Sequence, residues 1–133
     1  MKPIKKLASA NRGEVAARII RACDELGISS VLLHSQADQG TLAYRLATET
    51  LCIGASEVNE SYLSIEKTID GLEASGADAL HPGFGFLSEN AEFAQAVVDS
   101  GALFIGPKAD AIAKMGDKIT AKKIIDQAGV PSV

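Results

Sequence analysis

Short apolar runs alternate along this chain with segments that have the spacing of amphipathic helices. The runs are IKKLASA (4–10), SSVLLHS (29–35), ETLCIG (49–54), ADALHP (77–82) and ALFIG (102–106). Regular alternation of strands and helices with short connections favours right-handed crossovers and a parallel sheet covered on both faces. We therefore predict an α/β fold, built on a doubly wound, mainly parallel five-stranded sheet. The first strand has the weakest pattern, since Lys5, Lys6 and Ser9 dilute it.

The first predicted helix spans roughly residues 13–26. Five of its apolar residues fall on one face at the spacing of an amphipathic helix, and Gly27 follows as a C-terminal glycine should. These residues are Val15, Ile19, Ala22, Cys23 and Leu26. Further helices are expected at about 41–47, 61–74 and 90–100, and a last one after Asp117.

Composition narrows the function classes. A chain of 133 residues with 47% hydrophobic content fits a single domain. A formal charge of −4 argues against a nucleic-acid surface or a polybasic membrane anchor, so small molecules or proteins are the expected partners. The start MKPIKK is not followed by a signal-peptide core, which favours a cytoplasmic protein. Cys23 and Cys52 lie in apolar patterns without a CxxC motif and are predicted to be buried thiols, not zinc ligands.

Ligands of open parallel sheets bind beyond the carboxyl ends of the strands. Among the loops at that edge, HPGFGF (81–86) places glycines and aromatic residues between a strand and a helix, so it is either a simple turn or a ligand loop. A dinucleotide site would need GxGxxG after the first strand, where the chain has only ANRGE, a tight turn with an exposed Arg12. The P-loop pattern GxxxxGK[ST] is also absent from the sequence.

Several charged residues allow two interpretations. Lys118 of MGDK stands at the start of a predicted helix, where it either points into water beside a capping Asp117 or contacts a phosphate. On the first helix, the flank formed by Arg18, Arg21 and Glu25 is either solvated, with an Arg21–Glu25 ion pair, or part of a subunit contact. The two histidines, at positions 34 and 81, lie at strand ends without a catalytic pattern and are interpreted as structural.

Three motifs in register resemble one known family. ANRGEVAARIIRAC, HPGFGFLSEN and IGPKADAIAKMGDK are similar to the N-terminal domain of biotin carboxylase, the ATP-grasp component of acetyl-CoA, propionyl-CoA, methylcrotonyl-CoA and pyruvate carboxylases. The resemblance covers essentially the whole chain, including the terminal AGVP. It implies a Rossmann-like leading domain, residues 1–133, of an enzyme that uses Mg-ATP and bicarbonate to carboxylate a biotin held by a carrier protein.

The resemblance also assigns residues. It implies that Lys118 binds ATP, that Gly83, Phe84 and Gly85 form a loop facing the biotin pocket, and that the flank of the first helix contributes to the dimer contact of bacterial members. That flank consists of Arg18, Arg21 and Glu25. No catalytic residue and no metal ligand of the family is expected in this stretch of sequence.

Three positions depart from the family's usual pattern. Ser9 replaces an aliphatic residue in the first strand, Phe84 replaces a tyrosine, and Thr48 replaces an acidic residue in LATET. Ser9 is expected to weaken the core unless the backbone satisfies its hydroxyl group. Phe84 keeps the aromatic ring but lacks a hydroxyl that could form a hydrogen bond in the pocket.

The family's glycine-rich lid, magnesium-binding carboxylates, bicarbonate base and enolate-stabilising arginine lie after this domain. The chain alone is therefore expected to be inactive and to bind no cofactor tightly, whereas the full enzyme uses ATP, Mg²⁺ and biotin. Expected partners are the rest of the carboxylase, the biotin carboxyl carrier, the carboxyltransferase and a possible second copy. The alternatives are a free-standing binding or dimerisation module and a different ATP-grasp enzyme with the same leading domain.

Overall fold

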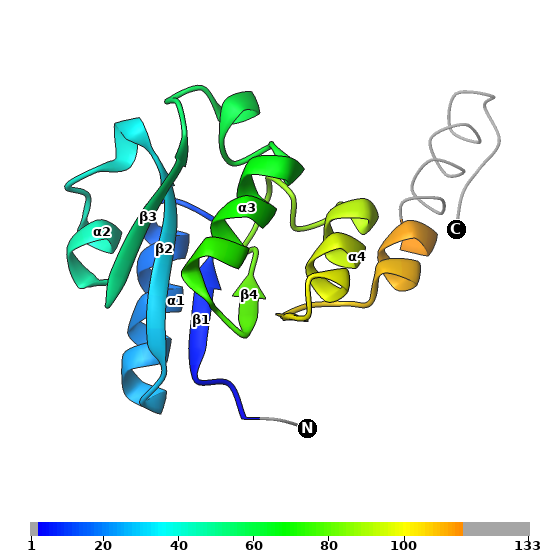
Figure 1. Ribbon diagram of the computed structural model, residues 1–133, viewed down its shortest axis with the longest axis horizontal. Coiled ribbons are helices and arrows are strands. Elements are labelled where there is room, and N and C mark those ends of the chain that lie inside the picture. The colour runs from blue at the N-terminus through cyan, green and yellow to red at the C-terminus, as the bar shows by residue number, and fades with distance from the viewer. Residues whose placement is uncertain (1–2, 116–133) are drawn as a thin grey trace, which may run out of the picture.

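A five-stranded sheet forms the centre of the protein in the computed structural model, which describes residues 3–115 (Figure 1). The strands lie in the order β3-β2-β1-β4-β5, and all neighbouring pairs are parallel. The predicted α/β fold with a parallel five-stranded sheet is thus confirmed. The strands are β1 (Lys6–Ser9), β2 (Ser29–Ser35), β3 (Glu49–Gly54), β4 (Ala79–His81) and β5 (Leu103–Phe104).

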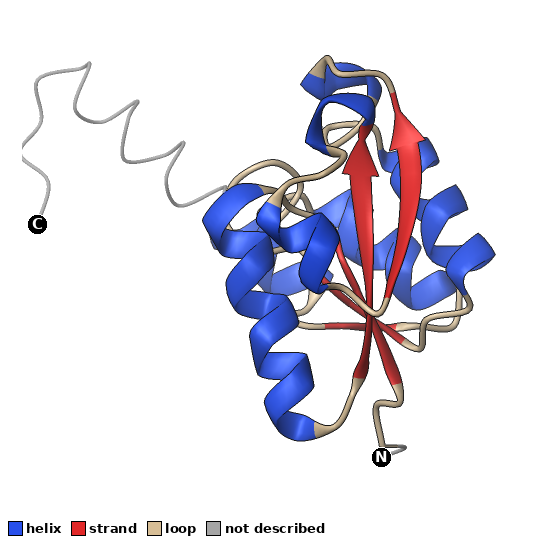
Figure 2. Ribbon diagram, turned by 90° about the vertical axis from the view of Figure 1, so that its left-hand side faces the viewer, coloured by secondary structure: helices blue, strands red, loops and turns tan. Residues whose placement is uncertain are grey.

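Helices cover both faces of the sheet (Figure 2). On one face, α1 (Gly13–Leu26) and α2 (Leu42–Leu46) pack on the sheet through small and branched residues such as Ala16 and Ile20. On the other face, α3 (Ile65–Ser75) and α4 (Ala91–Asp99) contribute Leu72, Phe93 and Val97 to the largest core cluster. Two short 3-10 helices, η1 (Gln36–Asp38) and η2 (Val58–Glu60), lie in the connections that flank β3.

For three of the helices, a capping side chain marks the first residue more precisely than apolar periodicity does. The side chains of Thr41, Ser64 and Asn90 each accept a backbone N–H of the following first turn. The third helix was predicted to begin near residue 61, which is wrong, because η2 and a turn precede the Ser64 cap. The helix predicted after Asp117 lies outside the described residues.

The first strand, whose sequence pattern is weakest, occupies the middle of the sheet. Leu7, Ala8 and Ser9 are buried between β2 and β4. Lys6 is tolerated at the start of the strand because its ammonium group donates to the backbone oxygen of Ser75 at 3.0 Å and pairs with Glu49 at 2.6 Å. Sheet pairing and buried neighbours thus outweigh the polar residues in this segment.

The two cysteines differ in their surroundings. Cys23 of α1 is buried as predicted, and burial together with the charge of Asp24 raises the pKa of its thiol. The prediction for Cys52 is wrong, because this residue is exposed. Successive strand residues face opposite sides, so Leu51 and Ile53 pack toward the core while Cys52 of the edge strand β3 faces away from it.

Two of the residues that depart from the family pattern have contrasting surroundings. Thr48 forms a reciprocal pair with Ser30, in which the hydroxyl of Thr48 accepts the Ser30 N–H and the hydroxyl of Ser30 accepts the Thr48 N–H, both at 3.1 Å. Ser9, in contrast, is fully buried, and its hydroxyl oxygen finds no partner among the described residues. The hydroxyl of Ser9 is thus not satisfied by the backbone, which is the condition under which Ser9 is expected to weaken the core.

We predict that Ser9→Ala stabilises the protein by about 1 kcal/mol, because it removes a buried hydroxyl that forms no hydrogen bond. Ser30→Ala is the matched control, since Ser30 is equally buried on the neighbouring strand but its hydroxyl is bonded to Thr48. It should destabilise by about 1 kcal/mol. Urea denaturation of both variants measures the two changes in unfolding free energy, and a loss of stability in Ser9→Ala would contradict the prediction.

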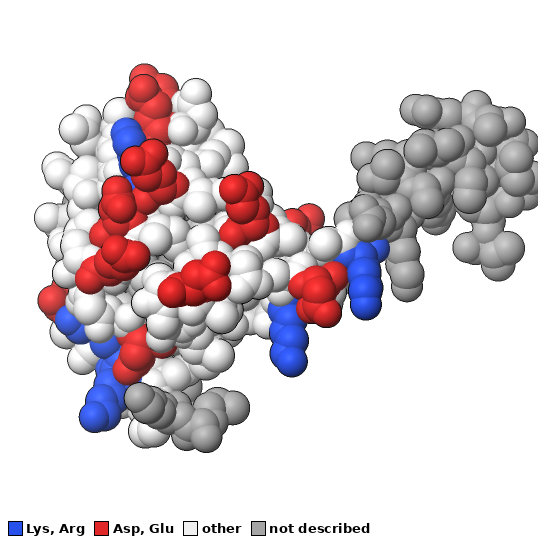
Figure 3. Space-filling view, turned by 45° about the vertical axis from the view of Figure 1, so that its right-hand side comes forward, with Lys and Arg blue, Asp and Glu red and all other residues white. Residues whose placement is uncertain are grey.

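Charged side chains spread over the surface without forming a basic stripe on the face seen in Figure 3, where acidic residues predominate. Within residues 3–115, no helix is both long and apolar enough to cross a membrane.

Candidate ligand site at the carboxyl edge of the sheet

The strand order reverses between β1 and β4, so the turns that follow these two strands lie side by side. We call residues 82–86 the glycine-rich loop. The buried side-chain amide of Asn11, just after β1, donates to the backbone oxygens of Pro82 and Phe84, each at 2.7 Å. A crevice at such a reversal is the usual ligand position in open α/β sheets. The predicted ligand edge is therefore built from these two turns.

Gly83 approaches the turn after β1 so closely that it has no space for a side chain. Its φ is 68°, and an added Cβ would lie 2.6 Å from both the Asn11 amide nitrogen and a methyl of Val15. Gly85 has almost the same φ of 69° but nothing within 4 Å of the corresponding position. The missing Cβ at Gly83 thus lets the loop contact Asn11 of the same chain.

His81, the last residue of β4, stabilises the loop that follows it. Its ring Nδ1 accepts the backbone N–H of Gly83 at 3.0 Å, which requires the neutral ring, and burial lowers the pKa of this histidine. His34 is buried, its Nδ1 lies 2.8 Å from the backbone oxygen of Ser35, and its ring meets Tyr44 edge-on. Both sets of contacts are those of structural histidines, in agreement with the sequence interpretation.

Phe84 projects from the loop, with 80% of its surface exposed. Its ring and Gly83 line an apolar groove of about 510 Å³ that extends along α1, and Arg18 lies on the same groove. The rest of the lining is mostly aliphatic and includes Leu7, Val15, Ile19, Leu26 and Ile105. The structure therefore brings the predicted biotin-facing loop close to one of the three predicted dimer-contact residues.

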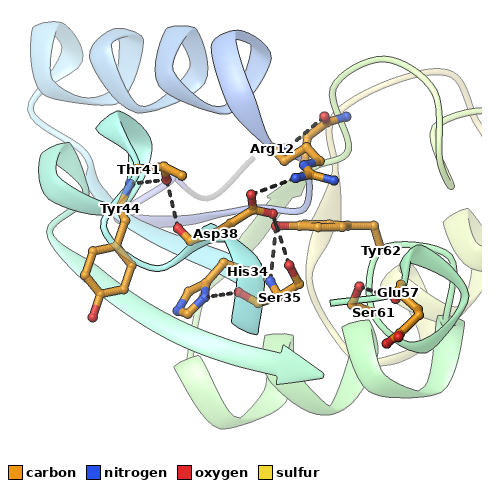
Figure 4. Close-up of polar contacts among 10 residues, drawn as sticks. Arg12, His34, Ser35, Asp38, Thr41, Tyr44, Glu57, Ser61 and Tyr62 are labelled. Carbon is orange, nitrogen blue, oxygen red and sulfur yellow. Dashed lines mark hydrogen bonds and ion pairs between the residues drawn. The ribbon is translucent and has the colours of Figure 1, made fainter. Parts of the chain in front are cut away.

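A polar cluster lies on the other side of the reversal point (Figure 4). We call Arg12, Ser35, Asp38 and Tyr62 the Asp38 cluster. The carboxylate of Asp38 pairs with the Arg12 guanidinium at 2.9 Å and accepts from the hydroxyls of Ser35 and Tyr62. The sequence prediction of an exposed Arg12 holds only in part, since its side chain is 41% exposed but is held by the ion pair and by the Tyr62 ring, 5.7 Å away.

The hydroxyl group of Tyr62 is expected to lose its proton at an unusually high pH. Burial and the hydrogen bond to Asp38 raise the pKa of its hydroxyl from 10.0 to about 12. Because the folded-state pKa is raised, the associated stability is complete below pH 10 and is lost as the pH rises through about 12. The chain contains two tyrosines, so Tyr44→Phe leaves Tyr62 as the one reporter. Its tyrosinate absorbance should show a midpoint near pH 12, and a midpoint at the ordinary value would contradict this assignment.

The predicted dimer-contact residues Arg18, Arg21 and Glu25 are exposed on α1. The ion pair on this helix joins Arg18 to Glu14 at 3.6 Å, and the predicted Arg21–Glu25 pair does not form in the described structure. Both pairings have the i,i+4 spacing, and the one nearer the helix start places the acidic residue where the helix dipole favours it. A dimer contact through this flank stays a prediction.

Lys118, predicted to contact ATP, lies outside the described residues. Within residues 3–115, no group of three or more histidine, cysteine and acidic side chains is arranged to hold a metal ion.

Sequence reasoning missed Tyr62. It drew attention to Arg12 because ANRGE follows the first predicted strand, but Tyr62 lies beyond β3 in a connection predicted to be helical. The signal that was available is the segment SYLS (61–64), in which an aromatic residue of a type that is often buried lies between two serines. Its pairing with Asp38, 24 positions earlier, depends on the tertiary fold.

The strand order and the glycine-rich loop at the reversal point define a Rossmann-like α/β domain whose predicted ligand edge lies beside β1 and β4. The family model "Biotin carboxylase, N-terminal domain" matches residues 3–112, and the chain belongs to this family. It is 55% identical over 130 residues to a biotin carboxylase of Haemophilus influenzae, a match that covers 98% of this chain and 29% of that protein. It is 47% identical to a propionyl-CoA carboxylase alpha chain of Ruegeria pomeroyi, a match that covers 96% of this chain and 19% of that protein.

Solved structures agree with this membership. The biotin carboxylase domain of a thermophilic 2-oxoglutarate carboxylase, solved with bicarbonate, superposes with a TM-score of 0.85 at 42% identity, covering 99% of this chain and 30% of that one. The biotin carboxylase domain of the Hydrogenobacter thermophilus 2-oxoglutarate carboxylase, a dimer in complex with MgADP, ADP and bicarbonate, gives 0.86 at 41% identity, covering 100% and 29%. The chain thus spans less than a third of the length of these relatives.

Proposed function

We propose that this chain forms the leading domain of a biotin-dependent carboxylase, in which the complete enzyme uses Mg-ATP and bicarbonate to carboxylate a carrier-bound biotin. The observation that carries the proposal is the glycine-rich loop, which exposes the ring of Phe84 at the ligand edge of the sheet. A flat apolar ring on a fixed backbone is suited to form one wall of a pocket for a heterocyclic ligand such as biotin.

The cofactors divide between this domain and the rest of the enzyme. Gly83, Phe84 and Gly85 are the residues of this chain that would face biotin, and Lys118 is the residue that would contact ATP. The magnesium ligands are expected downstream of this domain. The proposed partners are that downstream region, the biotin carrier, the carboxyltransferase and a second copy bound through Arg18, Arg21 and Glu25, in the cytoplasm.

A fusion enzyme tests this proposal. Residues 1–133 are joined to the downstream region of the Haemophilus influenzae biotin carboxylase, in place of the segment to which they are 55% identical. The fusion is expected to release phosphate from ATP in a biotin- and bicarbonate-dependent manner, whereas the 133-residue chain alone is not. A fusion that binds Mg-ADP, and therefore contains a folded nucleotide site, but releases no biotin-dependent phosphate would refute the proposal.

The second candidate function is a dimerisation module without catalysis. The exposed flank of α1 next to an apolar groove favours it. Sedimentation of the 133-residue chain separates the two, since a stable dimer that Arg18→Glu abolishes, together with an inactive fusion, would support the module.

A further inference from the structure

The glycine-rich loop is held on both sides of its exposed ring. Before and at Phe84, the Asn11 amide donates to the backbone oxygens of residues 82 and 84. After it, the ring of Phe86 stacks on Tyr62, with ring centroids 5.1 Å apart and planes 24° from parallel. The side chain that meets solvent is thus carried by a short backbone segment fixed at two points.

Phe86 has a backbone conformation that needs support from its surroundings. Its φ is 47°, and it is the one non-glycine residue among the described positions with a positive φ. Such a conformation is unfavourable for a residue with a Cβ, and it persists where contacts of the side chain compensate. The stacking on Tyr62 is a contact of this kind, so loss of the Tyr62 ring should free the loop to leave this conformation.

Tyr62 is itself fixed by groups from the half of the sheet that lies across the reversal point from the glycine-rich loop. Its hydroxyl accepts the backbone N–H of Ser35 at 3.1 Å and donates to Asp38, which the Arg12 guanidinium neutralises (Figure 4). The residue is 2% exposed and belongs to the connection between β3 and α3, whereas the loop follows β4. Tyr62 therefore links the loop to a rigid, charge-paired anchor across the reversal point.

We infer that Tyr62 is a positioning residue, which holds the glycine-rich loop through Phe86 so that Phe84 is presented to the biotin ligand in a preformed orientation. The inference rests on the proposed function, because it takes the ligand of the loop to be biotin. A loop that must first adopt its binding conformation lowers the apparent affinity by the fraction of molecules that are competent. The Asp38 cluster then acts on biotin binding without touching the ligand.

The test compares Tyr62→Leu with Tyr62→Phe in the fusion enzyme. Tyr62→Leu removes the ring that stacks on Phe86, and it should raise KM for free biotin about fivefold to tenfold while kcat changes less than about twofold. KM for ATP should stay unchanged, which a general loss of folding would not produce. Tyr62→Phe retains the ring, and it should keep KM for biotin within about twofold of the unsubstituted fusion.

Phe86→Leu removes the same stacking contact from the side of the loop. Because Phe86 is only half-buried, this variant is expected to fold even if Tyr62→Leu does not. It should raise KM for biotin in the same way. Equal effects on the biotin and ATP constants, or an unchanged biotin constant in both leucine variants, would overturn the inference.

A failure of the proposed function is recognised separately, since the unsubstituted fusion would then lack biotin-dependent phosphate release. In that case hydrogen exchange in the 133-residue chain decides the positioning role. The amides of Gly83 and Ser88, which donate within this segment at 3.0 and 2.9 Å, should exchange faster in Tyr62→Leu than in Tyr62→Phe. Equal exchange in the two variants would count against positioning by Tyr62.

Discussion

Gly83→Ala is expected to destabilise the protein by about 2–5 kcal/mol. A Cβ in the left-handed region costs about 1–2 kcal/mol by itself. At Gly83 this Cβ would also lie 2.6 Å from the Asn11 amide nitrogen and from Val15, and overpacking of this kind adds about 1–3 kcal/mol. Asn11 cannot move away cheaply, because the same amide group donates to both Pro82 and Phe84.

Gly85→Ala is the matched control, because the backbone conformation is nearly the same and the surrounding space is open. It should cost about 1–2 kcal/mol, the conformational part alone. The difference between the two variants in urea denaturation isolates the effect of the close contact between Gly83 and Asn11. Hydrogen exchange of the loop amides in the Gly85 variant checks that the loop keeps its conformation. Equal losses for both substitutions would mean that the contact between Gly83 and Asn11 does not constrain the loop.

The sequence predicted the fold well because its strands and helices have strong periodic patterns. The first strand shows where such patterns are insufficient, since Leu7, Ala8 and Ser9 are buried through pairing with β2 and β4, which the local sequence does not specify. Cys52 shows the reverse case, because an apolar segment was read as buried although β3 lies at the edge of the sheet. Whether a strand lies at the edge or at the centre of the sheet depends on the strand order.

The candidate site was predictable where it depends on turns and not where it depends on tertiary packing. The position of HPGFGF at the ligand edge followed from its place after a strand. The partner of Gly83 did not, because Asn11 lies about seventy positions earlier and meets the loop through the strand reversal. Likewise, Arg12 was read as exposed since its ion-pair partner, Asp38, becomes adjacent only when β1 and β2 pair.

Asp38→Ala should cost about 3–5 kcal/mol of unfolding free energy, the range for removing one member of a buried ion pair. Asp38 is 6% exposed, and its carboxylate is the acceptor for the Arg12 guanidinium and for the hydroxyls of Ser35 and Tyr62. After truncation, two buried hydroxyls and one partly buried cation lose this acceptor together. Because the Arg12 side chain is 41% exposed, water can solvate it in part, which favours the lower end of the range.

Two further variants separate charge from hydrogen bonding at this position. Asp38→Asn keeps an acceptor oxygen of similar size but removes the charge, so it should lose about 1–3 kcal/mol, less than the alanine variant. Asp99→Ala, at the exposed end of α4, should change stability by less than about 0.5 kcal/mol. All three are measured by urea denaturation at neutral pH. A loss below about 1 kcal/mol in Asp38→Ala would mean that the Asp38 cluster is not a rigid anchor, and it would remove the physical basis for positioning the loop through Tyr62.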